Sequence, residues 1–171
     1  MQALISLLWD IVLIRRGPRD LPSSWALLAL LGALYLATSV LGAELAYGAG
    51  HAFVRGGLDL VLTVAVFWAA LAFRDREHRL MQTLSALFGV GILLAVPDFA
   101  LLLLIQGASK PAALLLQLLA LALLLWNVVV VGHIVRAALD VKLFTGITVA
   151  MSYIVGSTLL FSYLPAPAPT G

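Results

Sequence analysis

The chain has 171 residues, of which 63% are hydrophobic and 11% are charged, whereas a soluble domain has about 25% charged residues. This deficit of charge indicates that lipid is the solvent. A net charge of +2 is too small to indicate nucleic-acid binding, and the absence of cysteine excludes disulfides and thiol chemistry. The sequence has no phosphate-binding loop, dinucleotide-binding glycine pattern or zinc-ligand spacing, so we expect no cofactor and no metal. An intramembrane enzyme is the third and least favoured interpretation, because the apolar runs lack a paired acid and base or a histidine-rich metal cluster, and we expect no enzymatic activity.

The first 16 residues predict a short amphipathic helix. Gln2, Ser6 and Asp10 recur at every fourth position and form a narrow polar stripe on an otherwise apolar helix. The segment is too short to span a bilayer, and its basic residues stand at its end, whereas a signal peptide begins with them. We expect an interfacial helix that lies on the bilayer; the alternative is a helix packed under the bundle. The adjacent basic cluster is suited to lipid headgroups and comprises Arg15, Arg16 and Arg19.

Five apolar runs follow, and each is long enough to cross the ~30 Å hydrocarbon core as a helix. The predicted spans cover about residues 25–43, 57–73, 81–106, 112–135 and 143–163. The proline-rich tail, residues 164–171, is expected to be extended. The sequence therefore predicts an all-α integral membrane protein with a single membrane domain, in which an N-terminal interfacial amphipathic helix accompanies a bundle of five transmembrane helices.

The third span carries Pro97 and Asp98 deep inside an apolar run. Pro97 removes one backbone donor and is expected to kink the helix. An ionised carboxylate at the depth of Asp98 costs on the order of 3 kcal/mol, which a polar partner, a water-filled vestibule or protonation would relieve. The functional interpretation is an ion, proton or ligand site. The structural interpretation is a hydrogen bond between helices, or an aspartate hydrated near the interface.

The fourth span supplies two amides. Gln117 lies at about the same depth as Asp98 from the end that the third and fourth spans share, so it is the first candidate partner for that carboxylate. Asn127 lies deeper, and amides in such places commonly form interhelical hydrogen bonds worth ~0.6 to 2 kcal/mol.

A group of charged residues follows the fourth span at the membrane surface. His133, Arg136 and Asp140 are spaced by three and four positions and therefore share one helical face. We interpret them as an interfacial salt-bridged cluster, and the alternative is a catalytic or metal role. A metal site would need more ligands than one histidine and one aspartate.

The positive charges divide unequally between the two sides that five spans define. The N-terminal side holds eight of the ten basic residues, namely Arg15, Arg16, Arg19, Arg74, Arg76, Arg79, Arg136 and Lys142. This bias predicts a cytoplasmic N-terminus and an external C-terminus. Several acidic or titratable residues then fall in the outer half and would form an acidic, outward-facing vestibule if the helices brought them together. These are Glu44, His51, Asp59 and Asp98.

Three stretches carry a resemblance to a known family: residues 15–22 before the first span, 79–89 opening the third, and 132–140 joining the fourth to the fifth. Over nearly its whole length the chain resembles the Yip1 family, and its short bacterial members in particular. The resemblance implies five spans with a cytoplasmic N-terminal segment and, here, the bacterial inner membrane. It implies no catalytic residues. Eukaryotic members are implicated in membrane trafficking and bind small GTPases, but this chain has almost no soluble region to dock one.

Two functional interpretations follow. The first is a scaffold or adaptor that acts through helix–helix and lipid contacts, with the bilayer and either a second copy or another membrane protein as partners. The second is a small transporter or channel subunit with an intramembrane carboxylate site at Asp98, for which Gln117, Asn127, Glu44 and Asp59 complete the candidate polar residues.

Overall fold

The computed structural model describes residues 2–47 and 52–163, and within these ranges it contains helices and no strand. The α-helices are α1 (Gln2–Val12), α2 (Trp25–Tyr47), α3 (Ala52–Ala72), α4 (Leu80–Gly107), α5 (Lys110–Leu139) and α6 (Leu143–Ser162), with short 3-10 helices η1 (Pro18–Asp20) and η3 (Glu77–Arg79). Five of the described helices, α2 to α6, are long and apolar enough to cross a membrane. The predicted all-α membrane bundle with a short N-terminal helix is confirmed. Residue 51 and the tail lie outside the described residues.

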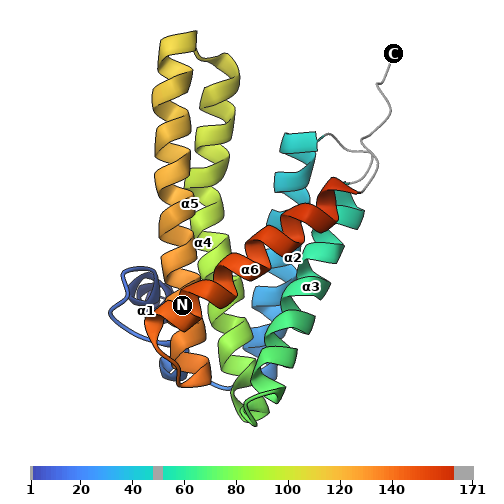
Figure 1. Ribbon diagram of the computed structural model, residues 1–171, viewed down its shortest axis with the longest axis vertical. Helices are drawn as coiled ribbons and strands as arrows, with labels where there is room; N and C mark the ends of the chain where they lie inside the picture. Colours follow the sequence, from blue (N-terminus) through green and yellow to red (C-terminus); the bar gives the residue numbers. More distant parts are fainter. Residues whose placement is uncertain (1, 48–51, 164–171) are drawn as a thin grey trace.

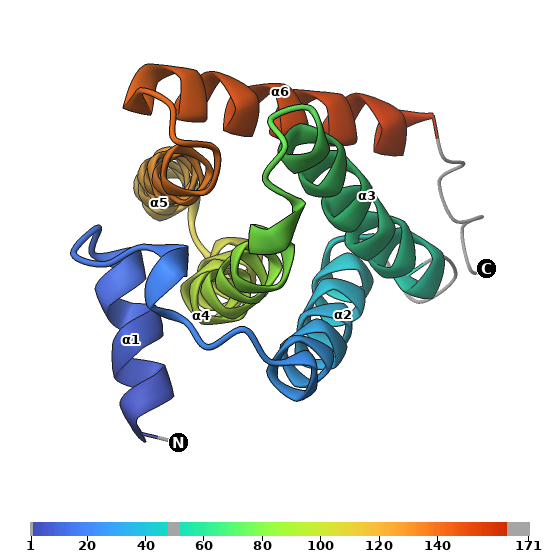
Figure 2. The ribbon, with the colours of Figure 1, turned by 90° about the horizontal axis from the view of Figure 1, so that it is seen from below.

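The first half of α4 is the centre of the bundle. Seen from below, α4 has α1, α2, α3 and α5 around it, while α6 crosses along one side and contacts α5 and α3 (Figure 2). Every residue of α4 from Thr83 to Val90 is buried. Because no face of this segment is free, the helix must be contacted closely from several sides at once.

Glycines on α4 make these close contacts possible. A Cβ at Gly89 would lie 2.5 Å from Cδ2 of Leu8 on α1, and one at Gly91 would lie 2.7 Å from Cε2 of Tyr35 on α2. Small residues allow helices in lipid to approach closely, and dispersion contacts then hold them together. α4 also continues without interruption through Pro97.

The N-terminal helix packs against the bundle and keeps a second apolar face exposed. Leu8, Ile11 and Val12 are buried, and α1 contacts α4 and α5, so this helix packs against the bundle. Ile5, Trp9 and Leu13, each four residues from the next, are 46–48% exposed and form an apolar stripe on its outer side. α1 is therefore docked on the bundle through one face and offers a second apolar face to its surroundings.

α4 and α5 form a hairpin that extends beyond the ends of α2 and α6 (Figure 1). With 28 and 30 residues, these helices are roughly 42 Å and 45 Å long at ~1.5 Å per residue, so they exceed a ~30 Å hydrocarbon core. The outer half of the hairpin, residues 96–125, is poorly covered by the other helices. Its exposed apolar side chains are Val96, Leu103, Leu104, Leu114, Leu115, Leu118, Leu119, Leu121, Leu124 and Leu125.

Candidate functional sites

Asp59 on α3 is the centre of an intramembrane polar network. Its Oδ2 accepts hydrogen bonds from the Tyr35 hydroxyl at 2.7 Å and the Ser39 hydroxyl at 3.0 Å, both on α2. Its Oδ1 accepts a third from the Tyr153 hydroxyl of α6 at 3.1 Å. A carboxylate offers about four lone-pair sites, so three are occupied here. The side chain of Asp59 thus joins three membrane-spanning helices.

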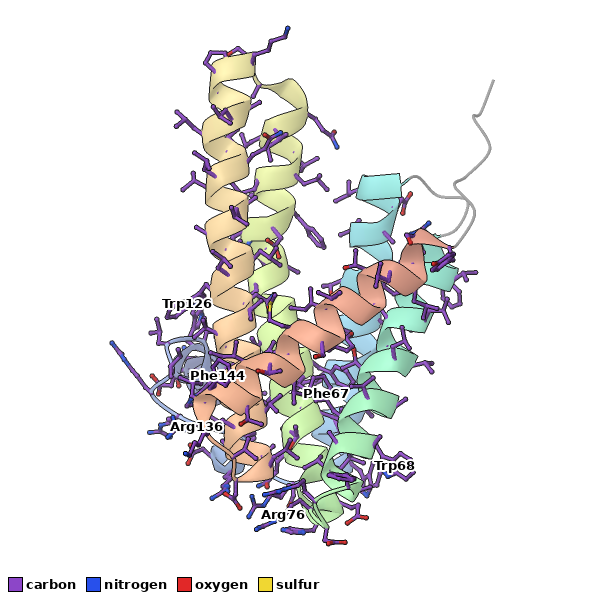
Figure 3. All side chains as sticks on the ribbon, in the orientation of Figure 1. Phe67, Trp68, Arg76, Trp126, Arg136 and Phe144 are labelled. Atoms are coloured by element: carbon purple, nitrogen blue, oxygen red, sulfur yellow. The ribbon has the colours of Figure 1, made fainter. Side chains whose placement is uncertain are left out.

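Thr63, one turn after Asp59, extends the network on the side of α6. Its hydroxyl lies 2.7 Å from the Tyr153 hydroxyl and 2.8 Å from the backbone carbonyl oxygen of Asp59. Each hydroxyl has a single hydrogen, so while Tyr153 donates to Asp59 Oδ1, Thr63 donates either to the Tyr153 oxygen or to the backbone carbonyl of Asp59. Ring contacts position both tyrosines: Tyr35 lies 4.9 Å from Phe88, and Tyr153 lies 5.5 Å from Phe67 between ring centroids. Figure 3 shows Phe67 between α3 and α6.

A small cavity lies next to this network. Arg55 precedes Asp59 by one helical turn and is 8% exposed, and both line a hollow of about 180 Å³ together with Ser39. Gly56 brings α2 and α3 together at this level, because a Cβ there would lie 2.8 Å from the backbone nitrogen of Val40. The cavity is lined by one guanidinium group and one carboxyl group, which suits a small polar molecule.

Asp98 does not form the predicted pair with Gln117. Both side chains are exposed, and neither has a hydrogen bond or ion pair with any part of the chain that the structure describes. Asn127 is half-buried and likewise makes no side-chain hydrogen bond within residues 2–47 and 52–163. Depth along two neighbouring helices did not determine which faces the side chains occupy, and Asp98 and Gln117 both lie on exposed faces of the hairpin (Figure 1).

The predicted acidic vestibule is not assembled as one site by the described residues. Glu44 is exposed and lines a groove with Phe53, whereas Asp59 lines the separate cavity beside Arg55. Asp98 lines neither hollow. Among these three acids, Asp59 alone takes part in a hydrogen-bonded network with other described residues.

Sequence reasoning did not identify the donors of this network, although a signal for them exists. On α3, Arg55, Asp59 and Thr63 recur at every fourth position, and on α2, Tyr35 and Ser39 have the same spacing. Polar residues at this spacing share one helical face. Two such stripes in neighbouring apolar helices indicate faces that meet.

A second polar centre lies at the end of the bundle that carries most of the positive charge. Asp140 caps α5 with a left-handed φ of 53°, which aspartate tolerates better than most residues. Its carboxylate pairs with Arg19, with Arg76 at 3.0 Å and with Arg79 at 2.9 Å. The hydrogen bond from Arg79 and then that from Arg19 hold the pKa of Asp140 below its usual value.

The same arginines also satisfy the end of α5. Arg79 donates to the backbone oxygen of Ala138 at 3.0 Å, and Arg19 donates to that of Ala137 at 2.9 Å. Carbonyl groups in the last turn of a helix lack intrahelical partners and carry partial negative charge, so guanidinium groups stabilise them. The carboxylate of Asp140, after α5, thus binds arginines from the segment before α2 and from the segment between α3 and α4.

A pocket of about 580 Å³ opens beside Asp140, and we call it the basic pocket. It brings together the two groups that the sequence predicted separately, the headgroup cluster and the cluster after the fourth span. Its lining includes Arg15, Arg16, Arg19, His133, Arg136 and Asp140. Arg136 and Arg76 lie at the same end of the bundle in Figure 3. The ion-pair partners of Asp140 come from other segments rather than from its helical neighbours Arg136 and His133.

His133 joins the two walls of the basic pocket. Its Nε2 lies 3.0 Å from the backbone carbonyl oxygen of Arg16. Because a carbonyl oxygen only accepts, Nε2 carries the hydrogen and donates it. This bond ties the segment after α1 to α5.

No group of three or more potential metal ligands of the His, Cys, Asp or Glu type occurs in the described part of the chain. We found no match to this chain among protein-family models, curated proteins or solved structures.

Proposed function

We propose that this protein is a scaffold or adaptor that acts through helix–helix and lipid contacts and does not catalyse a reaction. The observation that carries the proposal is Asp98. The residue is exposed within a membrane-spanning helix, and its carboxyl group has no polar partner among residues 2–47 and 52–163. A charged or polar group facing lipid is costly, and a donor on another helix would relieve that cost.

The surroundings of Asp98 support this proposal. The hairpin outer half carries a dense run of exposed apolar side chains, and Gln117 adds a further exposed polar group to it. Apolar surface alone does not drive association in lipid, because lipid tails are equally apolar. A partner helix that supplies a hydrogen-bond donor would add the specific attraction that lipid cannot. We propose a second copy of this chain or another membrane protein as that partner.

Photocrosslinking in membranes tests the scaffold proposal. A photoreactive residue replaces Leu103 on the hairpin outer half or Val61 on α3, which are 54% and 61% exposed. Crosslinks to a reproducible protein or to a second copy are expected at Leu103, and crosslinks to lipid alone at Val61. Combining the Leu103 probe with Asp98→Leu should reduce the protein crosslink. Equal protein crosslinking at both positions, or no effect of Asp98→Leu, would contradict the proposal.

We further propose a place in the bacterial inner membrane, with the N-terminus in the cytoplasm, and membership of the Yip1 family. Because the chain has no cysteine, single cysteines report orientation directly. Lys110→Cys, at the first residue of α5, should react with an impermeant maleimide in intact cells, whereas Arg74→Cys, between α3 and α4, should react only after permeabilisation. The opposite labelling pattern would invert the proposed topology.

The cavity beside Asp59 supports a second candidate, a small transporter or channel subunit. A buried arginine and a carboxylate line this hollow, whereas Asp98, the residue first expected in this role, lines none of the hollows described above. The test is proton flux into proteoliposomes that contain a pH-sensitive dye. Flux above that of protein-free vesicles, lost in Asp59→Asn and retained in Asp98→Asn, would support this candidate. Flux equal to that of empty vesicles would eliminate it.

A further inference from the structure

The basic pocket has a surplus of positive charge that its own acids do not neutralise. Four arginines line it, Arg15, Arg16, Arg19 and Arg136, against two aspartates, Asp20 and Asp140. With His133 neutral, two positive charges remain in excess. A hollow with this balance attracts an anion.

Of the four arginines that line the pocket, two already pair with an aspartate and two do not. Arg19 is engaged with Asp140, and the side chain of Arg16 lies 3.4 Å from that of Asp10. Arg15 and Arg136 are exposed, and their guanidinium groups have no hydrogen bond or ion pair with any residue that the structure describes. These two guanidinium groups are therefore the ones in the pocket that a ligand can bind.

The two available guanidinium groups come from different segments that the fold holds together. Ile14 has a left-handed φ of 60°, which ends α1 and directs the following arginines to the pocket that α5 also lines. The hydrogen bond from His133 to the Arg16 carbonyl then fixes this turn against α5. A β-branched residue with positive φ is uncommon and persists where the surrounding structure requires it. The two walls of the pocket are thus held before any ligand arrives.

We infer that the basic pocket binds a phosphate group through Arg15 and Arg136. The planar guanidinium fork matches two phosphate oxygens at once, which is why arginine predominates where phosphate is recognised. At about 580 Å³ the pocket also accommodates the group that carries the phosphate. The phosphate belongs either to the headgroup of an anionic lipid, since the pocket lies at an end of the membrane-spanning helices, or to a soluble phosphorylated molecule.

Binding to the full-length protein in detergent micelles tests this inference. The probes are phosphatidic acid, diacylglycerol as its phosphate-free counterpart, and inorganic phosphate. Retained lipid is measured by native mass spectrometry, and inorganic phosphate by calorimetry. The test variant is Arg15→Gln with Arg136→Gln. Its control is Arg74→Gln with Lys142→Gln, which removes the same charge from exposed positions outside the pocket at the same end of the bundle.

Wild type is expected to retain phosphatidic acid but not diacylglycerol. Affinity should fall roughly a hundredfold in the test variant, which is about tenfold for each of the two guanidinium groups lost, because each forms charge-assisted hydrogen bonds to the phosphate. The control variant should bind like wild type. Binding of phosphatidic acid but not of inorganic phosphate assigns the site to a lipid headgroup, whereas binding of inorganic phosphate without retention of phosphatidic acid assigns it to a soluble molecule. No phosphate binding, or equal losses in the test and control variants, would overturn the inference. The scaffold proposal does not depend on either result.

Discussion

Asp59 and Asp98 are both aspartates in membrane-spanning helices, yet their surroundings are opposite. Asp59 accepts three hydroxyl hydrogen bonds from two neighbouring helices, whereas Asp98 is exposed and has no such donor in the described chain. In lipid, a carboxylate that accepts hydrogen bonds from neighbouring helices links them together. A carboxylate without such donors raises the free-energy cost of placing its helix in the membrane. At the residue scale, we therefore assign the stability of the bundle to Asp59 and partner binding to Asp98.

Replacing Asp59 should destabilise the protein, while replacing Asp98 should not. Asp59→Ala removes the shared acceptor of Tyr35, Ser39 and Tyr153 and should cost about 1–3 kcal/mol. Asp98→Ala removes a side chain without polar contacts and should leave the melting temperature unchanged or raise it. Thermal unfolding of the purified protein, followed by tryptophan fluorescence, measures both. Equal melting temperatures for the two variants would refute the structural role of Asp59.

The helices themselves could be predicted well because lipid imposes length and apolarity on each span separately. The contacts between helices could not be predicted, because the hydropathy of a single helix does not determine which other helices pack against it. Hydropathy ranked Asp98 first, since it lies deepest in an apolar run, but the network formed at Asp59, where α2 and α6 provide donors. The second span was predicted to begin at about residue 57, whereas α3 begins at Ala52 and includes Arg55.

At the element scale, small residues decide which helices can meet. α5 and α6 approach so closely that a Cβ at Gly132 would lie 2.9 Å from Cα of Ile147. A Cβ at Gly146 would collide with the backbone carbonyl oxygen of Gly132. Gly156, farther along α6, has nothing within 4 Å of such a Cβ. The same helix therefore contains one glycine required by packing and one that is not.

Two glycine substitutions on α6 test this difference. Gly146→Ala places a methyl group against backbone that cannot move aside, and should cost about 1–3 kcal/mol because overpacking forces backbone shifts. Gly156→Ala should be neutral or stabilise by up to about 1 kcal/mol, because alanine is the better helix former. Thermal unfolding of the two variants is compared with wild type. A loss at Gly156→Ala as large as that at Gly146→Ala would show that close approach is not the cause.

At the scale of the whole molecule, two carboxylates connect segments that are distant in the chain. Asp59 links α2, α3 and α6 within the bundle, and Asp140 links the segments before α2, between α3 and α4, and after α5 at one end. The basic pocket opens beside Asp140, so the same contacts that close this end of the bundle also shape the pocket. Neither carboxylate contacts the hairpin outer half, so this part of the protein remains free to bind a partner.

The connection at Asp140 predicts a dependence of stability on pH. Hydrogen bonds from Arg79 and Arg19 lower the pKa of Asp140 from its ordinary value of about 3.8, so folding favours the ionised form. The stabilisation is complete above that ordinary value and is lost as the pH falls through the lower pKa of the folded state. Asp140→Asn lacks this contribution. Wild type should therefore melt at a higher temperature than Asp140→Asn at neutral pH, and the difference should shrink below about pH 4.

Asp75→Asn is the matched control for this prediction, because Asp75 is also exposed with a φ of 53° but forms no ion pair among the described residues. Its melting temperature should follow that of wild type at every pH. Melting curves across the acidic range measure all three proteins. If the difference in melting temperature between wild type and Asp140→Asn stays constant down to the lowest pH, the three arginines do not stabilise the folded protein through the charge of Asp140. Limited proteolysis at neutral pH gives a second measure, since releasing these segments should make the connection between α3 and α4 more accessible in Asp140→Asn than in Asp75→Asn.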